Sequence, residues 1–159
     1  MELSTHTFCP ITLTLTEKFY LDYPSDNYPE ILEKSKRAYN CLMLELNDYY
    51  ICIPYRSEMR HKQGYKFTKS KRSIKSQSGL DYTKIVIVKN IEYLSKLNAV
   101  IDADEFKETV ENIGKIARGA NRFITDYIKI VRNNVDDKGL PKRFRFSTLQ
   151  YFHKELSIL

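Results

Sequence analysis

The chain has 159 residues, of which 42% are hydrophobic, so we expect one domain spanning residues 1–159 around one packed core. Its formal net charge of +6 favours RNA, DNA or an anionic membrane surface as a partner. No apolar run approaches the roughly 18–20 residues of a membrane-spanning helix, and the N-terminal segment lacks the pattern of a secretory signal. We therefore expect a cytoplasmic protein.

The N-terminal third predicts strands joined by loops. Residues 11–16 read ITLTLT, an alternation typical of a half-buried strand. Residues 22–28 predict a loop, and Pro29 suits the first position of a short helix over residues 29–37. Residues 39–46 and 49–54 predict a hairpin with Asn47-Asp48 as a two-residue turn. Pro54 has no N–H to donate, so the second strand is expected to end there.

The remainder predicts a loop, a strand and two helices. Residues 56–75 are expected to be mostly loop, with at most a turn of helix, and residues 84–88, KIVIV, a strand covered on both faces. Apolar residues recur at alternating four- and three-residue steps over residues 102–132, which predicts one long helix that Gly114 and Gly119 can bend or split. Residues 133–141 predict a loop. Ser147 and Gln150 form the capping-box pattern that opens a final helix.

Positive charge is concentrated in residues 56–75, which we call the basic segment. It holds eight Lys or Arg and one acid, Glu58, so the rest of the chain is close to neutral. Lys and Arg can bind phosphates while interleaved aromatic side chains stack on unpaired bases. We predict RNA binding rather than a merely solvated loop. If six cations contact phosphates, log K falls by about four per tenfold rise in salt. The predicted RNA-binding residues are Lys36, Tyr65, Lys66, Phe67, Lys69, Lys71, Arg72 and Lys75.

Two residues of the basic segment are candidates for chemistry. Neighbouring positive charge disfavours the protonated form of His61, and a neutral imidazole can act as a general base; an ordinary loop histidine is the alternative. Ser57 lacks the GxSxG context of a hydrolase. Its hydroxyl can instead orient a phosphate or a 2′-hydroxyl while Arg56, Arg60 and Lys62 neutralise charge, although a serine in a loop needs no function.

Metal and cofactor motifs are missing from the sequence. The three histidines lie far apart, and no pair of them has metal-ligand spacing. Neither a GxxxxGK[ST] nor a GxGxxG loop occurs. We therefore predict no metal and no cofactor. Cys9, Cys41 and Cys52 have no CxxC spacing and lie in apolar surroundings, which indicates buried, reduced thiols.

Residues 37–62, RAYNCLMLELNDYYICIPYRSEMRHK, resemble the type III toxin–antitoxin endoribonucleases of the ToxN/AbiQ group, and the Cpt branch in particular. The shared pattern is a basic residue before Ala-aromatic, a strand ending Leu-Glu-apolar, a turn, a second strand ending in Pro, and a polar loop with a serine. A weaker match lies at residues 146–149. Two positions depart from the pattern: Arg56 replaces a threonine, and Met59 replaces a lysine. The catalytic roles are therefore expected to be redistributed within the loop.

The resemblance implies an α+β fold, in which a compact, highly curved antiparallel β-sheet or barrel core carries a long helix and a C-terminal helix around it. It implies a sequence-preferring, metal-independent endoribonuclease toxin that cleaves RNA by attack of the 2′-hydroxyl and leaves a 2′,3′-cyclic phosphate. The implied partners are cellular RNA substrates and a structured, pseudoknot-like antitoxin RNA, which the toxin processes and which inhibits it in a closed protein–RNA hetero-oligomer without a membrane. The expected catalytic residues are Ser57, His61, Arg37, Arg56, Arg60 and Lys62.

Two other classes fit the sequence less well. A non-catalytic RNA-binding protein explains the basic segment equally well but does not need the spacing of Arg37 and Ser57. A DNA-binding regulator would carry its cations on a short recognition helix. Here the cations lie on a predicted loop, so this class ranks third.

Overall fold

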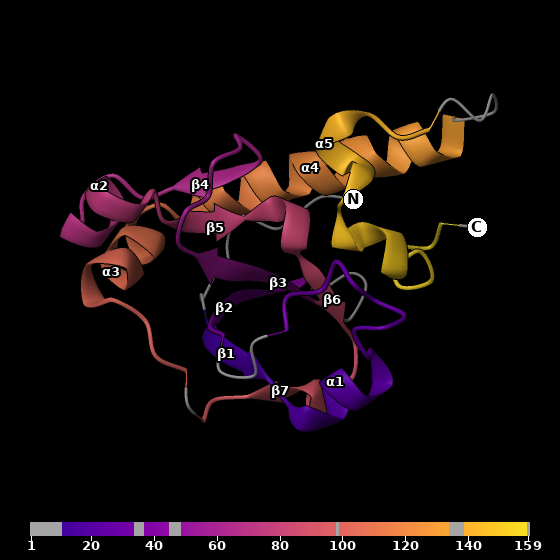
Figure 1. Ribbon diagram of the computed structural model, residues 1–159, viewed down its shortest axis with the longest axis horizontal. Coiled ribbons are helices and arrows are strands. Elements are labelled where there is room, and N and C mark those ends of the chain that lie inside the picture. The colour runs from indigo at the N-terminus through magenta and orange to yellow at the C-terminus, as the bar shows by residue number, and fades with distance from the viewer. Residues whose placement is uncertain (1–10, 34–36, 45–48, 98, 134–138, 159) are drawn as a thin grey trace.

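The computed structural model describes residues 11–33, 37–44, 49–97, 99–133 and 139–158. Its centre is a seven-stranded sheet in which every pair is antiparallel, so the predicted α+β class is confirmed (Figure 1). The strand order is β4-β5-β3-β2-β1-β7, and β6 pairs with β3. Within the described residues the end strands β4 and β7 do not pair with each other, so the sheet is open and the predicted barrel closure is wrong.

The chain enters the sheet at β1 (Ile11–Leu15), as predicted, and then forms a helix that was not predicted. Thr16 caps α1 (Glu17–Asp22) by accepting from the Phe19 N–H, and Phe19 is fully buried. The short helix predicted from Pro29 is absent from its described part, residues 29–33. There the Ile31 N–H donates to the Tyr28 carbonyl in a single turn that buries the Ile31 side chain.

The predicted hairpin is present as β2 (Tyr39–Leu44) and β3 (Tyr49–Arg56). Leu44 pairs with Tyr49, so four residues join the strands instead of two, and the Asn47-Asp48 turn itself lies outside the described residues. Cys41 and Cys52 face each other across the hairpin as buried free thiols, 2.9 Å between sulfur atoms. Cys9 lies outside the described residues.

Strand β3 continues two residues past Pro54, contrary to prediction. N–H groups alternate sides along a strand, and the Tyr55 N–H donates to Ala38 on the β2 side. The Pro54 nitrogen therefore faces the other side of β3. On that side the pairing with β6 ends at Cys52, and the pairing with β5 begins only at Tyr55. The missing donor lies in the gap between two partner strands, so it breaks no ladder bond.

The basic segment has more regular structure than predicted. It contains β4 (Gly64–Lys66) and α2 (Lys71–Ser76), which opens with a capping box between Ser70 and Ser73. The chain then returns through β5 (Gly79–Asp81) and the 3₁₀ turn η2 (Tyr82–Lys84). The predicted strand at residues 84–88 is confirmed as buried β6 (Val86–Val88) but starts later because η2 precedes it. The turn η3 (Ile91–Tyr93) leads into β7 (Leu94–Ser95).

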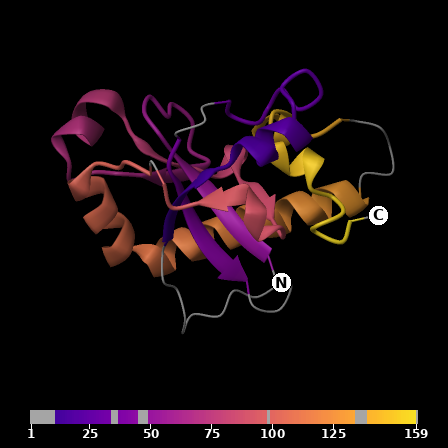
Figure 2. The ribbon, with the colours of Figure 1, turned by 90° about the horizontal axis from the view of Figure 1, so that it is seen from below.

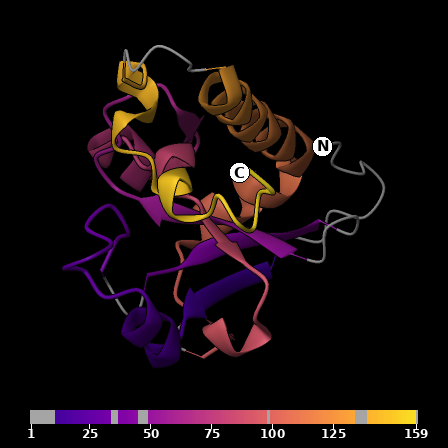
Figure 3. The ribbon, with the colours of Figure 1, turned by 90° about the vertical axis from the view of Figure 1, so that its right-hand side faces the viewer.

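Two helices replace the single long helix predicted for residues 102–132. They are α3 (Ala103–Glu111) and α4 (Ile113–Asn133), and α3 ends at Asn112, whose side chain donates to the Glu108 carbonyl. The break is therefore at an asparagine that caps the helix rather than at a glycine. Figure 3 shows α4 on the opposite side of the sheet from α1, and Figure 2 shows α2 and α3 together at one end of the molecule.

The C-terminal segment packs beside α4 without the predicted final α-helix. A short α5 (Lys142–Arg145) is followed by η4 (Thr148–Tyr151), a 3₁₀ helix capped by the Ser147 hydroxyl. The Gln150 side chain bonds the Ser147 carbonyl instead of completing the predicted capping box. The side chains of Leu149, Phe152 and Leu156 nevertheless face inward and are buried in the core.

Candidate functional site

The first cleft, of about 450 Å³, lies between the β2–β3 hairpin, α2 and the start of α3. Arg37 immediately precedes β2 and Ser57 immediately follows β3, and antiparallel pairing brings these two points of the chain to the same end of the hairpin. The two residues that the sequence singled out therefore line one cavity. Its other functional lining residues are Tyr55, Arg72, Val100, Ile101 and Asp102.

Arg37 has donor capacity left over in this cleft. One terminal nitrogen donates to the Tyr55 carbonyl at 3.1 Å, while the buried Nε has no hydrogen-bond partner among the described residues. Burial lowers the pKa of the Arg37 guanidinium, and the nearby positive charge of Arg56 lowers it further. An arginine remains protonated regardless. A bound anion would satisfy the free donor and relieve the charge repulsion.

Ser57 is exposed and held by the backbone on its C-terminal side. Glu58 adopts a left-handed conformation with φ of 55°, which is uncommon outside glycine. The Glu58 and Met59 N–H groups donate to the Ser76 and Gln77 carbonyls at the end of α2. Two backbone bonds and one strained residue thus fix the turn that presents the Ser57 hydroxyl.

Arg72 and Asp102 supply the remaining charges of the first cleft. Arg72 donates to Glu105 at 2.7 Å, and Glu105 is buried, so the guanidinium is held in place by α3. Asp102 is the N-cap of α3 and accepts from the Asp104 and Glu105 N–H groups through one carboxylate oxygen, Oδ1. The cleft therefore combines two guanidinium groups, one hydroxyl and one carboxylate.

Arg56 and His61 lie at the buried carboxylate of Asp81. Arg56 donates to Oδ2 at 2.7 Å, while the Thr83 N–H and hydroxyl donate to Oδ1 at 2.9 and 2.6 Å. The His61 Nε2 lies 3.1 Å from Oδ1. Burial alone raises the pKa of Asp81, but the bonds from His61, Thr83 and Arg56 outweigh it, so the pKa lies below its ordinary value. Asp81 is therefore ionised at neutral pH.

Both ring nitrogens of His61 face protein groups. The Gln63 N–H donates to Nδ1 at 3.0 Å, which leaves Nε2 to carry the proton of a neutral ring toward Asp81. The Gln63 N–H occupies the Nδ1 lone pair, and Nε2 lies near Asp81 without a hydrogen bond in the described residues, so the neutral ring has no free lone pair to take a proton from RNA. Its expected role as general base would require Nδ1 to lose the bond from Gln63.

The two aromatic side chains of the basic segment differ in exposure. Phe67 is 4% exposed and stacks on Tyr55, so the prediction that Phe67 stacks on bases is wrong. The Tyr65 hydroxyl donates to Glu108 at 2.8 Å, and the Lys115 ammonium lies 5.9 Å from its ring centroid. Burial and this hydrogen bond raise the pKa of the Tyr65 hydroxyl. Tyr65 thus anchors β4 to α3, but the residue is only half-buried, so its contact with a base stays a prediction.

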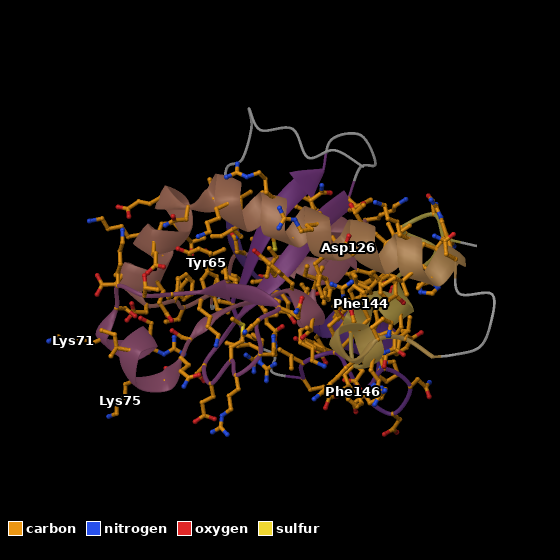
Figure 4. All side chains as sticks on the ribbon, turned by 90° about the horizontal axis from the view of Figure 1, so that it is seen from above. Tyr65, Lys71, Lys75, Asp126, Phe144 and Phe146 are labelled. Carbon is orange, nitrogen blue, oxygen red and sulfur yellow. The ribbon has the colours of Figure 1, made fainter. Side chains whose placement is uncertain are left out.

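The predicted cations occupy several different places. Lys69 pairs with Glu111 at 3.3 Å, and Lys62 lines a second cleft. Figure 4 shows Lys71 and Lys75 pointing away from the body of the molecule. Lys36 lies outside the described residues. Within the basic segment, the cations that are exposed and have no ion pair with a described residue are Arg60, Lys62, Lys66, Lys71 and Lys75.

Acidic partners of the basic segment were missed from the sequence. Glu105, Glu108 and Glu111 contact Arg72, the Thr68–Lys69 backbone and Lys69 respectively. Their three-residue spacing puts them on one face of a helix, so this acidic face could be predicted from the sequence. The contact between this face and the basic segment could not be predicted, because more than thirty residues separate the contacting residues.

Neither a metal cluster nor a membrane helix is found in the described residues. No group of three or more His, Cys, Asp and Glu side chains there is placed to hold a metal ion. No described helix is both long and apolar enough to cross a membrane. No protein-family model, curated protein or solved structure matches the chain.

Proposed function

We propose that the protein is an endoribonuclease that cleaves RNA in the first cleft without a metal ion. The observation that supports this most is the convergence of Arg37 and Ser57, twenty residues apart in sequence, on one cavity that also contains Arg72. Cationic donors beside a hydroxyl suit a reacting phosphodiester. The apolar side chains of Val100 and Ile101 in the lining offer a surface for a base.

The proposed reaction is attack of a ribose 2′-oxygen on the adjacent phosphorus. The bond from phosphorus to the 5′-oxygen breaks, which leaves a 2′,3′-cyclic phosphate and a 5′-hydroxyl. The reaction needs an acceptor for the 2′-proton and a donor for the leaving oxygen; in this proposal a water molecule in the open cleft protonates the leaving 5′-oxygen. Arg37 and Arg72 stabilise the charge of the phosphorane, and Ser57 orients the 2′-hydroxyl, because an ordinary serine is a poor base.

Asp102 is the best-placed proton acceptor in this proposal. Among the described residues it alone contributes a carboxylate to the lining of the first cleft, and its helix-capping bonds use Oδ1. His61 and Lys62 were expected to handle protons, but His61 is held at Asp81 and Lys62 lines another cleft. Arg56 and His61 become positioning residues, which fix the turn that carries Ser57.

The chemistry is tested by RNA cleavage in excess EDTA. We expect the wild type to cut and to leave 5′-hydroxyl ends, and Ser57→Ala to be slower by at least about 10²-fold. The second variant, Asp102→Asn, tests the proton acceptor alone, because asparagine caps a helix as well as aspartate does but cannot accept the 2′-proton as a base. We expect a similar loss from it with an unchanged melting temperature.

Each part of the proposal has its own contrary result. Loss of wild-type cleavage in EDTA contradicts the metal-free mechanism. Unchanged cleavage by Ser57→Ala or Asp102→Asn contradicts the assignment of that residue. Tight RNA binding by the wild type without cleavage of any RNA would identify a non-catalytic RNA-binding protein instead.

We further propose, from the resemblance of residues 37–62, that the enzyme is the cytoplasmic toxin of a type III system acting in phage defence, and that a structured repeat RNA blocks the first cleft. A cavity that holds a substrate phosphodiester can be filled equally by a folded RNA. Short tandem repeats and a terminator upstream of the gene are expected. Co-expression of that repeat RNA should restore growth that the protein alone arrests, and continued arrest would contradict the toxin assignment.

A further inference from the structure

A second cleft of about 200 Å³ lies between the β4 edge of the sheet and the helices α4 and α5. Its floor is aromatic, with Tyr82 and Phe144 among the lining residues. Tyr82 reaches α4 and donates to the Ile116 carbonyl at 3.0 Å. Gly119 permits this approach, because a Cβ there would lie 2.5 Å from the Tyr82 hydroxyl oxygen. The close packing of Tyr82 on α4 therefore builds a rigid floor.

The polar lining of the second cleft is strongly positive. Lys62, Arg122 and Arg143 line it from the loop before β4, from α4 and from α5, and Asp126 is the one acid among its described lining residues. Figure 4 labels Asp126 and Phe144 of this lining. None of the four takes part in an ion pair within the described residues, although Arg143 lies over the Phe144 ring at 4.6 Å. Most other cations near the sheet, such as Arg56, Arg72 and Lys84, do have carboxylate partners. The three cations of the second cleft thus remain available to an anionic ligand.

The loop that carries Ser57 connects the two clefts. Ser57 lines the first cleft and Lys62 the second, and between them Arg56 and His61 are both fixed at Asp81. The Tyr82 N–H donates to the Gln63 carbonyl at 3.0 Å, which attaches the far end of the loop to the floor of the second cleft. The two clefts are therefore lined by opposite ends of one loop, residues 57–63.

We propose that the second cleft binds a ribonucleotide of the RNA whose scissile phosphate occupies the first cleft. Lys62, Arg122 and Arg143 bind its phosphate, and the Asp126 carboxylate accepts from the ribose 2′-hydroxyl. Guanidinium and ammonium groups are the usual phosphate ligands in proteins. A 2′-hydroxyl is the group by which proteins distinguish RNA from DNA, and a carboxylate is its natural acceptor. The RNA assignment rests on the proposed function, whereas binding of a ribonucleotide phosphate does not.

The ligand class is tested by titrating ¹⁵N-labelled protein with uridine monophosphate. Gly64 and Gly119 both line the second cleft, so their amide signals should shift, whereas that of Gly114, also on α4 but outside the cleft, should not. Uridine without phosphate should cause no shift. Absence of shifts at Gly64 and Gly119, or equal shifts with uridine, overturns the site.

Two charge-neutralising variants make the test specific. Arg122→Gln combined with Arg143→Gln should weaken binding of uridine monophosphate at least tenfold. Lys107→Gln combined with Lys129→Gln removes the same charge from exposed positions outside both clefts and should leave it unchanged. Asp126→Asn should abolish a preference for uridine monophosphate over its 2′-deoxy form. Equal affinity of the wild type for the two nucleotides overturns the role of Asp126.

The RNA assignment is tested in the Ser57→Ala background in EDTA with a fluorescent single-stranded RNA. Adding the Arg122→Gln and Arg143→Gln changes should reduce the slope of log K against log salt by about 1.4, at 0.7 per phosphate contact. An unchanged slope with intact nucleotide binding would assign the site to a free nucleotide and overturn the RNA assignment. Because binding is measured without cleavage, failure of the proposed chemistry would leave this result interpretable.

Discussion

At the scale of single residues, Asp81 organises the loop that carries Ser57. It is fully buried and accepts from Arg56 and from both donors of Thr83, with His61 at ion-pair distance. A buried carboxylate is tolerated only when its charge is compensated in this way. The local sequence GLDYTK supplies only the Thr83 donors, and the charged partner is remote: Arg56 precedes Asp81 by 25 residues.

Asp81→Asn should destabilise the protein by about 2–3 kcal/mol at pH 7. Breaking a buried pair costs about 3–5 kcal/mol, and partial exposure of Arg56 reduces this. The folded pKa of Asp81 lies below its ordinary value, so its contribution is present above that ordinary value and disappears as the pH falls through the folded pKa. Urea unfolding of the wild type and variant should therefore converge toward pH 3.

The matched control for this experiment is Asp26→Asn, which changes an exposed turn residue and should have little effect at either pH. A gap between the wild type and Asp81→Asn that stays constant from pH 7 to pH 3 would show that the Asp81 charge contributes nothing to stability.

At the scale of elements, α3 holds the basic segment on the molecule. Glu108 is 2% exposed and accepts from the Thr68 and Lys69 N–H groups and from the Tyr65 hydroxyl. Its neighbours one turn before and after pair with Arg72 and Lys69. The acidic residues of α3 therefore offset part of the positive charge of the basic segment.

Glu108→Gln should release the segment between β4 and α2. Glu108 accepts through both carboxylate oxygens and a glutamine has only one acceptor oxygen, so at least one of the three donors loses its partner at a cost of about 1–3 kcal/mol. Amide hydrogen exchange at Thr68 and Lys69 should accelerate by at least about fivefold. Glu111→Gln removes the same charge from the same helix but breaks only the exposed pair with Lys69, worth about 1 kcal/mol or less, and should leave these amides protected.

At the scale of the whole molecule, charge is distributed between two clefts and an exposed edge. Of the eight cations in the basic segment, Arg56, Lys69 and Arg72 pair with carboxylates from other elements. The net positive field therefore comes from the remaining five and from residues such as Arg122 and Arg143 that sequence analysis did not connect with them.

The salt dependence of RNA binding measures how many of these cations contact phosphate. With the five unpaired cations of the basic segment in contact, log K should fall by about 3.5 per tenfold rise in salt, and by about 5 if Arg122 and Arg143 also contribute. Fluorescence anisotropy between about 50 and 500 mM salt gives the slope. A slope near zero would exclude RNA phosphates as the ligand of this surface.

The sequence by itself determined what depends on neighbours along the chain. Alternation at residues 11–16 indicated β1, and Asn47-Asp48 between two strand-like segments indicated the hairpin. The hairpin alone requires that Arg37 and Ser57 lie at one end of it. The apolar repeat of α4 and the buried face of the C-terminal segment were likewise visible, since a periodic pattern reports which side of an element is buried.

Only the tertiary structure decided which groups remain free for a ligand. The sequence indicated Phe67 as a residue that stacks on bases, but Phe67 is buried on Tyr55. It indicated His61 as a general base, but the His61 ring lies at Asp81. It placed Lys62 beside Ser57, but Lys62 lines the second cleft. The physical reason is that charge neutralisation and burial depend on contacts between residues far apart in sequence, such as Glu105 with Arg72. The first and second clefts are lined by groups that such contacts position or leave unpaired, so they exist only once the chain has folded.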